Sequence, residues 1–274
     1  MISDYLSVQT PITRYSEVES RRFGRSVARL TVPLRCELSD SELVALASSI
    51  DADLLILRSP TTRNRLGGML GANPKIQTIH ADTLLYFSRE LEGSHVNFRH
   101  SGSFYVSTEP IPSDELRDLI LATFADYQNH YSANPDLPSG AVQAGYAEWA
   151  FNTLTSEDGH LVTLRNKEIV VAFIVYSLFR HIGGEVHAEV LLNGTHPRFR
   201  NLGLYGVAFQ GSLADAASRG ARRMWISTQS SHRAMIRTWE KAGLRFEIGL
   251  NTYHCSPHQF REGRVNSLAS DNRS

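Results

Sequence analysis

The 274-residue chain is 42% apolar, so it can bury the core of one or two globular domains. Its 28 Lys and Arg residues balance 28 Asp and Glu residues, which gives no indication of a nucleic-acid partner. The 11 His residues stand singly, without the spacing of metal ligands, and Cys36 and Cys255 are too few to suggest a disulfide framework.

The sequence carries no targeting signal that we recognise. The first residues lack a charged segment followed by an apolar run, and no stretch of about 18 apolar residues is present. We therefore expect a soluble cytoplasmic protein without a membrane partner.

Residues 1–110 have the pattern of a small α/β domain. Ser39 and Asp40 can cap a helix, and Glu42 adds an acidic residue to its first turn. Short apolar runs separated by polar turns indicate strands. Strands are predicted at 27–32, 53–58, 76–79, 83–87 and 104–106, and helices at 39–50 and 62–69.

Residues 111–256 form a second predicted domain, which follows a proline-containing linker at 109–112. Its predicted helices are 113–124, 146–154, 204–219 and 231–242, and its predicted strands are 161–165, 169–176, 186–192, 223–227, 246–250 and 251–255. A polar C-terminal tail, 257–274, is expected to be loose. The sequence shows no internal repeat with a fixed period.

A basic and glycine turn, Arg200-Asn201-Leu202-Gly203, leads directly into the predicted helix 204–219. The first N–H groups of a helix have no acceptor within it, and the helix dipole adds partial positive charge there. Such a turn favours an anionic group such as a pyrophosphate, whereas the simpler interpretation is a helix start with two surface arginines.

Two motifs resemble those of the GNAT superfamily of acyl-CoA-dependent N-acyltransferases. The segment THPRFRNLGLY at 195–205 is similar to its acyl-CoA motif, and WEKAGL at 239–244 is similar to its second motif. Gly203 and Trp239 are 36 residues apart (239 minus 203), with a helix and a strand between them. The resemblance covers residues 113–255. It implies an α/β GNAT fold, a mixed central sheet flanked by helices, preceded here by the smaller α/β N-terminal domain.

The resemblance also implies the function of an acetyl-CoA-dependent N-acetyltransferase, in which an amine attacks the thioester directly. Acetyl-CoA would be the cosubstrate, without a metal. The residues it assigns to acetyl-CoA are Leu192, Arg198, Arg200, Asn201, Leu202, Gly203, Leu204, Tyr205, Gly206 and Trp239.

Two residues depart from the family pattern. Tyr205 stands where the second small residue of the acyl-CoA turn is usual, and Trp239 stands where a tyrosine usually acts as general acid. An indole N–H is too weak an acid to protonate a departing thiolate. Either another group supplies the proton, or the step needs no protein acid, or the chain is not catalytic.

Several residues are candidates for the proton transfers. Glu189 or His187, which alternate on one face of a predicted strand, could accept the amine proton. Tyr205, Tyr253 and His232 are candidates for the acid. For each of these residues an ordinary packing, capping or surface role is the alternative.

The chain also resembles the TDP-fucosamine acetyltransferases within this superfamily. Arg22-Phe23-Gly24, Ser227-Thr228-Gln229 and Tyr146-Ala147-Glu148-Trp149 carry that similarity. It implies a nucleotide-linked amino sugar as the acceptor, with Tyr127, His130, Tyr131 and His187 as candidates for binding it. The alternatives are another small amine, such as an amino acid or antibiotic, and a non-catalytic fold that binds CoA. A homodimer is an assembly we also consider.

Overall fold

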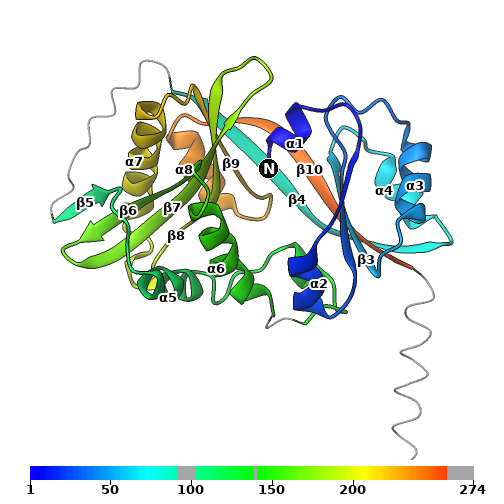
Figure 1. The fold of residues 1–274 in the computed structure, drawn as a ribbon, viewed down its shortest axis with the longest axis horizontal. Coiled ribbons are helices and arrows are strands. Elements are labelled where there is room, and N and C mark those ends of the chain that lie inside the picture. Colours follow the sequence, from blue (N-terminus) through cyan, green and yellow to red (C-terminus); the bar gives the residue numbers. More distant parts are fainter. Residues whose placement is uncertain (92–102, 139–140, 258–274) are drawn as a thin grey trace, which may run out of the picture. The chain divides into compact units, whose positions relative to one another are not determined.

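The computed structural model describes residues 1–91, 103–138 and 141–257. The chain forms two compact units that interleave along the sequence (Figure 1). Unit 1 comprises Met1–Ser3, Leu85–Gln128 and Gly140–Ile248, and unit 2 comprises Asp4–Leu84, Asn129–Ser139 and Gly249–Ser274. A single cut near residue 110 therefore does not separate the two units.

Unit 1 is built on a sheet whose central strands follow the order β9-β8-β7-β6-β5. Neighbouring strands are antiparallel except for β8 and β9, which are parallel. The strands are β5 Phe104–Ser107, β6 Gly159–Asn166, β7 Ile169–Arg180, β8 Val186–Thr195 and β9 Arg223–Gln229. The helices are α5 Ser113–Thr123, α6 Ala141–Leu154, α7 Leu204–Ser218 and α8 Arg233–Lys241.

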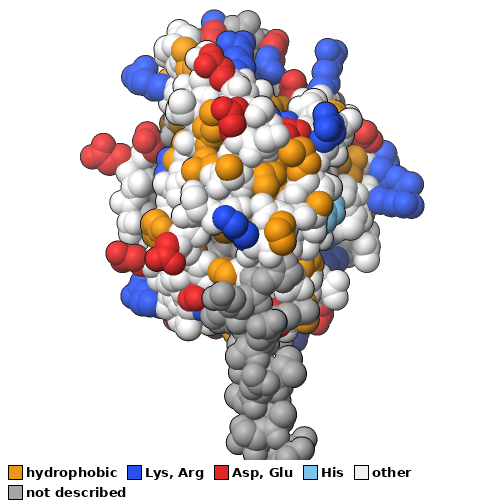
Figure 2. All heavy atoms as spheres, turned by 90° about the vertical axis from the view of Figure 1, so that its right-hand side faces the viewer, with side chains coloured by type: hydrophobic (Ala, Val, Ile, Leu, Met, Phe, Trp, Pro, Cys, Tyr) orange, Lys and Arg blue, Asp and Glu red, His pale blue; other side chains and the backbone are white. Residues whose placement is uncertain are grey.

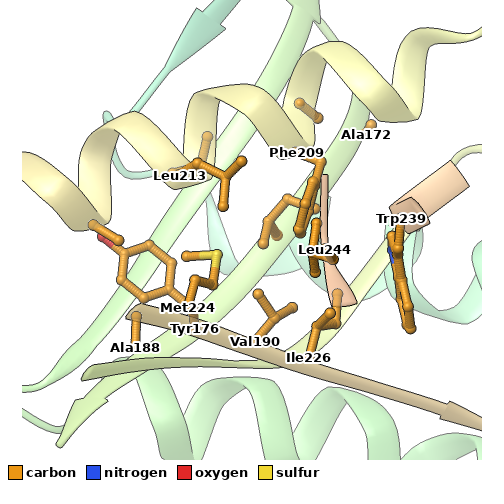
Figure 3. Close-up of a cluster of buried hydrophobic side chains, with 14 of the residues drawn as sticks. Ala172, Tyr176, Ala188, Val190, Phe209, Leu213, Met224, Ile226, Trp239 and Leu244 are labelled. Carbon is orange, nitrogen blue, oxygen red and sulfur yellow. The ribbon is translucent and has the colours of Figure 1, made fainter. Parts of the chain in front are cut away.

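Alternation along β7 creates the two cores of unit 1. Phe173 and Val175 pack with α5 and α6, whereas Ile174 and Tyr176 pack with α7. Figure 3 shows the α7 side, where Phe209 lies with side chains from the sheet. Because successive side chains of a strand point to opposite faces, a strand apolar at every position is buried on both sides. Unit 1 is therefore a three-layer α/β/α structure, in agreement with the expected mixed sheet flanked by helices.

The strands of unit 2 follow the order β1-β2-β3-β10. β2 and β3 are parallel, and the two outer pairings are antiparallel. Helices α3 and α4 cover one face through an apolar cluster that includes Leu30, Leu57 and Leu43. The elements are α1 Ser3–Leu6, β1 Ile12–Tyr15, α2 Glu17–Phe23, β2 Val27–Thr31, α3 Asp40–Ser49, β3 Leu54–Pro60, α4 Leu66–Gly71 and the 3-10 turn η1 His130–Ala133.

The order of elements repeats within the chain, although the sequence shows no fixed period. β2-α3-β3-α4-β4 and β8-α7-β9-α8-β10 each run from a parallel pair of strands with intervening helices into one long strand. The long strands are β4, Ile76–Glu90, and β10, Arg245–Pro257. β4 begins in unit 2 and ends in unit 1, and β10 does the reverse.

Several predicted boundaries were wrong. The strands predicted at 76–79 and 83–87 form the single strand β4, and those predicted at 246–250 and 251–255 form β10. Polar residues interrupt both apolar runs, but in the structure each strand continues through them, with His80 of β4 exposed and Thr252 of β10 buried. The predicted helix 62–69 is α4, Leu66–Gly71, and the predicted helix 146–154 begins earlier, at Ala141.

Two expectations concern the surface and the ends of the chain. Basic and acidic side chains both occur on the face drawn in Figure 2, in keeping with the balanced charge of the sequence. Within the described ranges, no helix combines the length and the apolar character that a bilayer span requires. Apart from Pro257, the predicted polar tail lies outside the described residues.

Candidate functional site

A fork between two parallel strands defines the candidate site in unit 1. β8 and β9 pair from His187↔Arg223 to Val190↔Ile226. β8 then continues to Thr195 and β9 to Gln229, with no further pairing between them in this described stretch. Backbone groups on the facing edges of the fork are therefore available to a ligand.

A β-bulge in β8 lies at the base of the fork. Val175 pairs with Leu192 and Tyr176 pairs with Val190, so Leu191 is one residue too many for the ladder. A bulge bends its strand and changes the face to which the following side chains point. Val190 accordingly packs with the α7 cluster, whereas Leu192 packs with the α5 and α6 cluster.

The turn after β8 has the geometry of an anion-binding helix start. Gly203 is the N-cap of α7, with φ +73° and no side chain to cap the helix. Asn201 also has a positive φ, of 64°. A Cβ added at Gly203 or Gly206 would meet no atom within 4 Å, so space is open above the first turn. The first N–H groups of α7 are thus exposed to this space.

The two arginines of the turn differ in position. Arg198 is exposed at the 3-10 turn η2, Pro197–Phe199. The guanidinium of Arg200 donates to the carbonyl oxygen of Thr123 at 2.7 Å and to that of Thr195 at 3.4 Å. Arg200 therefore ties the end of β8 to the end of α5, and both arginines are exposed to solvent.

Tyr205 and Trp239, the two departures from the family motifs, contact each other. Trp239 is 1% exposed and donates from Nε1 to the phenolic oxygen of Tyr205 at 3.0 Å. Its ring also meets the edge of Phe87, with the centroids 5.7 Å apart. Burial raises the pKa of Tyr205, and the hydrogen bond from Trp239 only partly opposes that rise. Tyr205 therefore keeps its proton throughout the neutral range.

His232 and Tyr127 lie together next to the carboxyl end of β9. Their ring centroids are 5.1 Å apart. The Nδ1 atom of His232 is 3.0 Å from the hydroxyl of Thr228, a residue of β9. Tyr127 also packs against Phe124 at the end of α5. The structure thus brings one predicted catalytic residue and one predicted acceptor residue to the fork.

Glu189 and His187 lie on the paired part of β8. Glu189 is 2% exposed, and its carboxylate accepts hydrogen bonds from the Ile2 N–H at 2.8 Å and the Tyr86 hydroxyl at 3.1 Å. His187 accepts a hydrogen bond on Nδ1 from Trp225, and burial lowers its pKa. His187 stands near the start of β8, so the structure does not bring it to the fork.

The remaining predicted site residues belong to unit 2. His130 is hydrogen-bonded to His254, with 2.9 Å between the ring nitrogens, and Tyr131 bonds the carboxylate of Glu19. Tyr253 packs into the apolar cluster of this unit. The segment predicted to bind the acceptor is therefore divided, because Tyr127 belongs to unit 1 whereas His130 and Tyr131 belong to unit 2.

The corresponding elements of unit 2, β2-α3-β3-α4, have neither the fork nor the open helix start. β2 and β3 pair over their full common length, from Val27↔Leu54 to Thr31↔Arg58, so no fork opens between them. The start of α3 is closed by a capping box, in which the carboxylate of Glu42 accepts from the Ser39 N–H at 2.8 Å. The Glu42 carboxylate therefore closes the start of α3, whereas no side chain caps the start of α7.

Sequence reasoning missed the close approach of β8 to α5. A Cβ added at Gly194 would lie 2.3 Å from Cγ2 of Thr123. Gly194 thus lets the strand after the bulge approach the helix, and the Thr123 carbonyl then holds Arg200. A single glycine in a strand is a signal of close backbone approach, but it does not identify the partner.

The sequence of residues 117–244 matches the model of the acetyltransferase (GNAT) family. The comparison with curated proteins gave no match. The match covers residues 117–244, and the description of the family names no substrate.

Solved structures share the fold over most of the chain. A GCN5-related N-acetyltransferase from Sphaerobacter thermophilus is 12% identical, covering 90% of this chain and 76% of that chain with a TM-score of 0.56. A tandem GNAT protein from the clavulanic acid biosynthesis pathway is 10% identical, with 84% and 75% covered and a TM-score of 0.56. A conserved protein of unknown function from Staphylococcus epidermidis ATCC 12228 is 8% identical, with 88% and 89% covered and a TM-score of 0.55.

At these identities the structural likeness concerns the fold alone. The fork, the bulge and the open helix start all lie within or beside the segment that the family model matches. Residues 117–244 therefore carry the GNAT acetyltransferase fold, preceded in the sequence by an α/β region.

Proposed function

We propose that the protein is an N-acetyltransferase that moves an acetyl group from acetyl-CoA to an amine. The observation that carries this proposal is the fork between β8 and β9, which leads directly to the open start of α7 at Gly203. The fork offers unpaired strand edges to the amide groups of pantetheine, and the helix start offers N–H groups and dipole charge to the pyrophosphate. Arg198 adds a solvent-directed positive charge.

The amine nitrogen attacks the thioester carbonyl carbon, the carbon–sulfur bond breaks, and the amide product loses the amine proton. The sequence offers no nucleophile elbow, so we propose direct attack without a covalent enzyme intermediate. Glu189 remains the proposed acceptor of the amine proton. It would have to exchange a hydrogen bond, such as the one from Ile2 or the one from Tyr86, for that proton or for a water that carries it.

Tyr205 is the proposed proton donor to the departing sulfur. It stands in the first turn of α7, and Trp239 donates to its oxygen, so the phenolic proton is free to be given elsewhere. Its raised pKa keeps it protonated in the neutral range. Tyr253, the other phenol considered, packs in the apolar cluster of unit 2, and His232 is engaged with Thr228.

For the acceptor we propose a nucleotide-linked amino sugar. Tyr127 and His232 present an aromatic surface with polar tips beside the fork, which suits a sugar face. Another small amine, such as an amino acid or antibiotic, would use the same surface. The replacement of the usual tyrosine by Trp239 favours one further candidate, a fold that binds CoA without turnover.

The decisive measurement is the release of CoA thiol with a panel of amines that includes TDP-linked amino sugars, other amino sugars, amino acids and aminoglycosides. Steady release with a TDP-linked amino sugar would establish both the reaction and the acceptor class. Release with another amine alone would keep the acetyltransferase and reject the sugar. Binding of CoA without release for any amine would leave only the non-catalytic candidate.

A further inference from the structure

One face of the unit 2 sheet carries two arginines among buried apolar side chains such as Val27 and Ile56. Ala28 and Leu30 of β2 pack with α3 and α4, so Arg29 between them points to the opposite face. By the same alternation, Arg58 of β3 points away from the cluster that contains Leu57. The register pairs Arg58 with Thr31, two residues beyond Arg29, so the two arginines are diagonal neighbours on this face.

Arg29 has an internal carboxylate partner. Its Nε and Nη2 atoms donate to Glu19 at 2.6 and 2.7 Å, and Nη2 also donates to the Tyr131 hydroxyl at 3.0 Å. Burial alone would raise the pKa of Glu19, but the hydrogen bonds and charge of Arg29, with help from Tyr131, lower it to about 2. The positive charge of Arg29 is thus balanced by a permanent negative charge.

Arg58 has no such partner. Its Nε atom donates to the Thr252 hydroxyl at 3.1 Å, and no carboxylate of the described residues lies within ion-pair distance of its guanidinium. Arg58 is of intermediate exposure, so its side chain is not sealed from solvent. Asp82, the other acidic residue that acts on this cluster, exerts its effect on His254.

Buried side chains lie close enough to these arginines for their pKa values to respond to the positive charges. The side chain of Arg29 is 38% exposed, whereas Tyr5, Tyr131 and His130 are each less than 9% exposed. Arg29 and Arg58 are themselves of intermediate exposure. Burial, followed by the charge of Arg58, holds the pKa of His130 well below its usual value, so that imidazole adds no charge.

We propose that Arg58, with Arg29 beside it, binds an oxyanion, the carboxylate or phosphate group of a small molecule, on this face of unit 2. A guanidinium matches two oxygens of such a group through two parallel N–H···O bonds. Because Glu19 is bonded to Arg29, an added anion would give Arg58 a charged partner of its own. This site does not depend on acetyl transfer and differs from the helix start at Gly203.

The test is calorimetric titration of the full chain with inorganic phosphate and, separately, with acetate, up to about 10 mM. Binding is expected to weaken at least tenfold in Arg58→Gln. It should weaken less in Arg58→Lys, which keeps the charge but loses the planar fork. Arg35→Gln is the matched control, because it removes the same charge from an exposed position of unit 2.

Each outcome decides the proposal. Tighter binding of phosphate would support a phosphate ester as the ligand, and tighter binding of acetate would support a carboxylate. The absence of heat with either anion would overturn the site, and so would an equal loss in Arg35→Gln. If the heat disappears only in Arg198→Gln, the anion binds at the acyl-CoA turn instead. Thermal denaturation of each variant shows whether it is folded, and Arg58→Lys supplies the answer if Arg58→Gln is not.

Discussion

Trp239 and Tyr205 form a hydrogen-bonded pair, with the indole Nε1 3.0 Å from the phenolic oxygen. Each residue replaces one that the family motif would place there, so the two departures are structurally linked. We expect Tyr205→Phe to lower turnover at least tenfold, about 1.4 kcal/mol in the barrier, because the proposed proton donor is removed. Trp239→Phe keeps the phenol and should lower turnover less.

A double-mutant cycle separates catalysis from packing at this pair. Both single variants break the same hydrogen bond, so their effects on the free energy of unfolding should not add in the double variant. If Tyr205→Phe changes unfolding but leaves turnover intact at neutral and high pH, Tyr205 only packs. In that case Tyr253→Phe and His232→Ala remain to be assayed, and three negative results would exclude a protein acid.

Gly203 provides a test of the proposed acyl-CoA site at the start of α7. An alanine at φ +73° is strained by roughly 1–2 kcal/mol and tilts the first N–H groups of α7. Gly203→Ala should therefore weaken CoA binding about tenfold, as measured by calorimetry. Gly220→Ala is the matched control, because Gly220 has φ +86° and lies at the other end of α7. It should cost similar stability and leave CoA binding unchanged; equal weakening in both variants would argue against a site at the turn.

The stoichiometry of CoA binding should be one per chain. Only one of the two repeated halves has a fork and an open helix start, whereas Glu42 closes the start of α3 in the other. Removing that carboxylate in Glu42→Ala should weaken the capping box of α3 and lower its stability, and should leave the stoichiometry at one, since β2 and β3 stay fully paired. Two CoA molecules per chain would show that our comparison of the repeats is mistaken.

His254 predicts loss of stability in mild acid. Burial, opposed by Asp82, lowers its pKa from 6.5 to about 4. A folded-state pKa below the unfolded one means that the unfolded chain binds the proton more readily. The free energy of unfolding that depends on neutral His254 is therefore fully present above pH 6.5. It is lost as the pH falls toward 4, by on the order of 3 kcal/mol in total.

Urea denaturation between pH 7 and pH 5 measures this effect, above the range in which Glu19 titrates. The slope of stability against pH should be smaller in His254→Asn, although that variant starts less stable because His130 loses its partner. His80→Gln, an exposed change in the same unit, should keep the slope of the unchanged protein. An unaltered slope in His254→Asn would assign the acid sensitivity to other groups.

Local patterns predicted much of the fold because they reflect local physics. The Gly203 turn, the capped start of α3 and the alternation of β7 all act within a few residues, and the structure contains each of them. The bulge at Leu191 was not predictable, since an extra residue in one strand is defined only by the register of its neighbour. The same reason hid the pair formed by Tyr205 and Trp239, which are 34 residues apart.

The structural repeat was hidden for a different reason. Its two copies share the order of elements but differ in the length of their helices and turns, so no period survives in the sequence. The predicted acceptor segment is divided between the two units, because the chain passes from unit 1 to unit 2 between Gln128 and Asn129. Neither event leaves a compositional signal.

The exchange of the long strands constrains how the protein can be made. β3 completes its pairing with β10 through contacts such as Pro60↔Leu250, whose partners are 190 positions apart in the chain (250 minus 60). During synthesis, β3 must wait with an unpaired strand edge until β10 has left the ribosome. A fragment ending near residue 110 would keep that edge permanently, so it should aggregate, whereas a chain that includes β10 closes it.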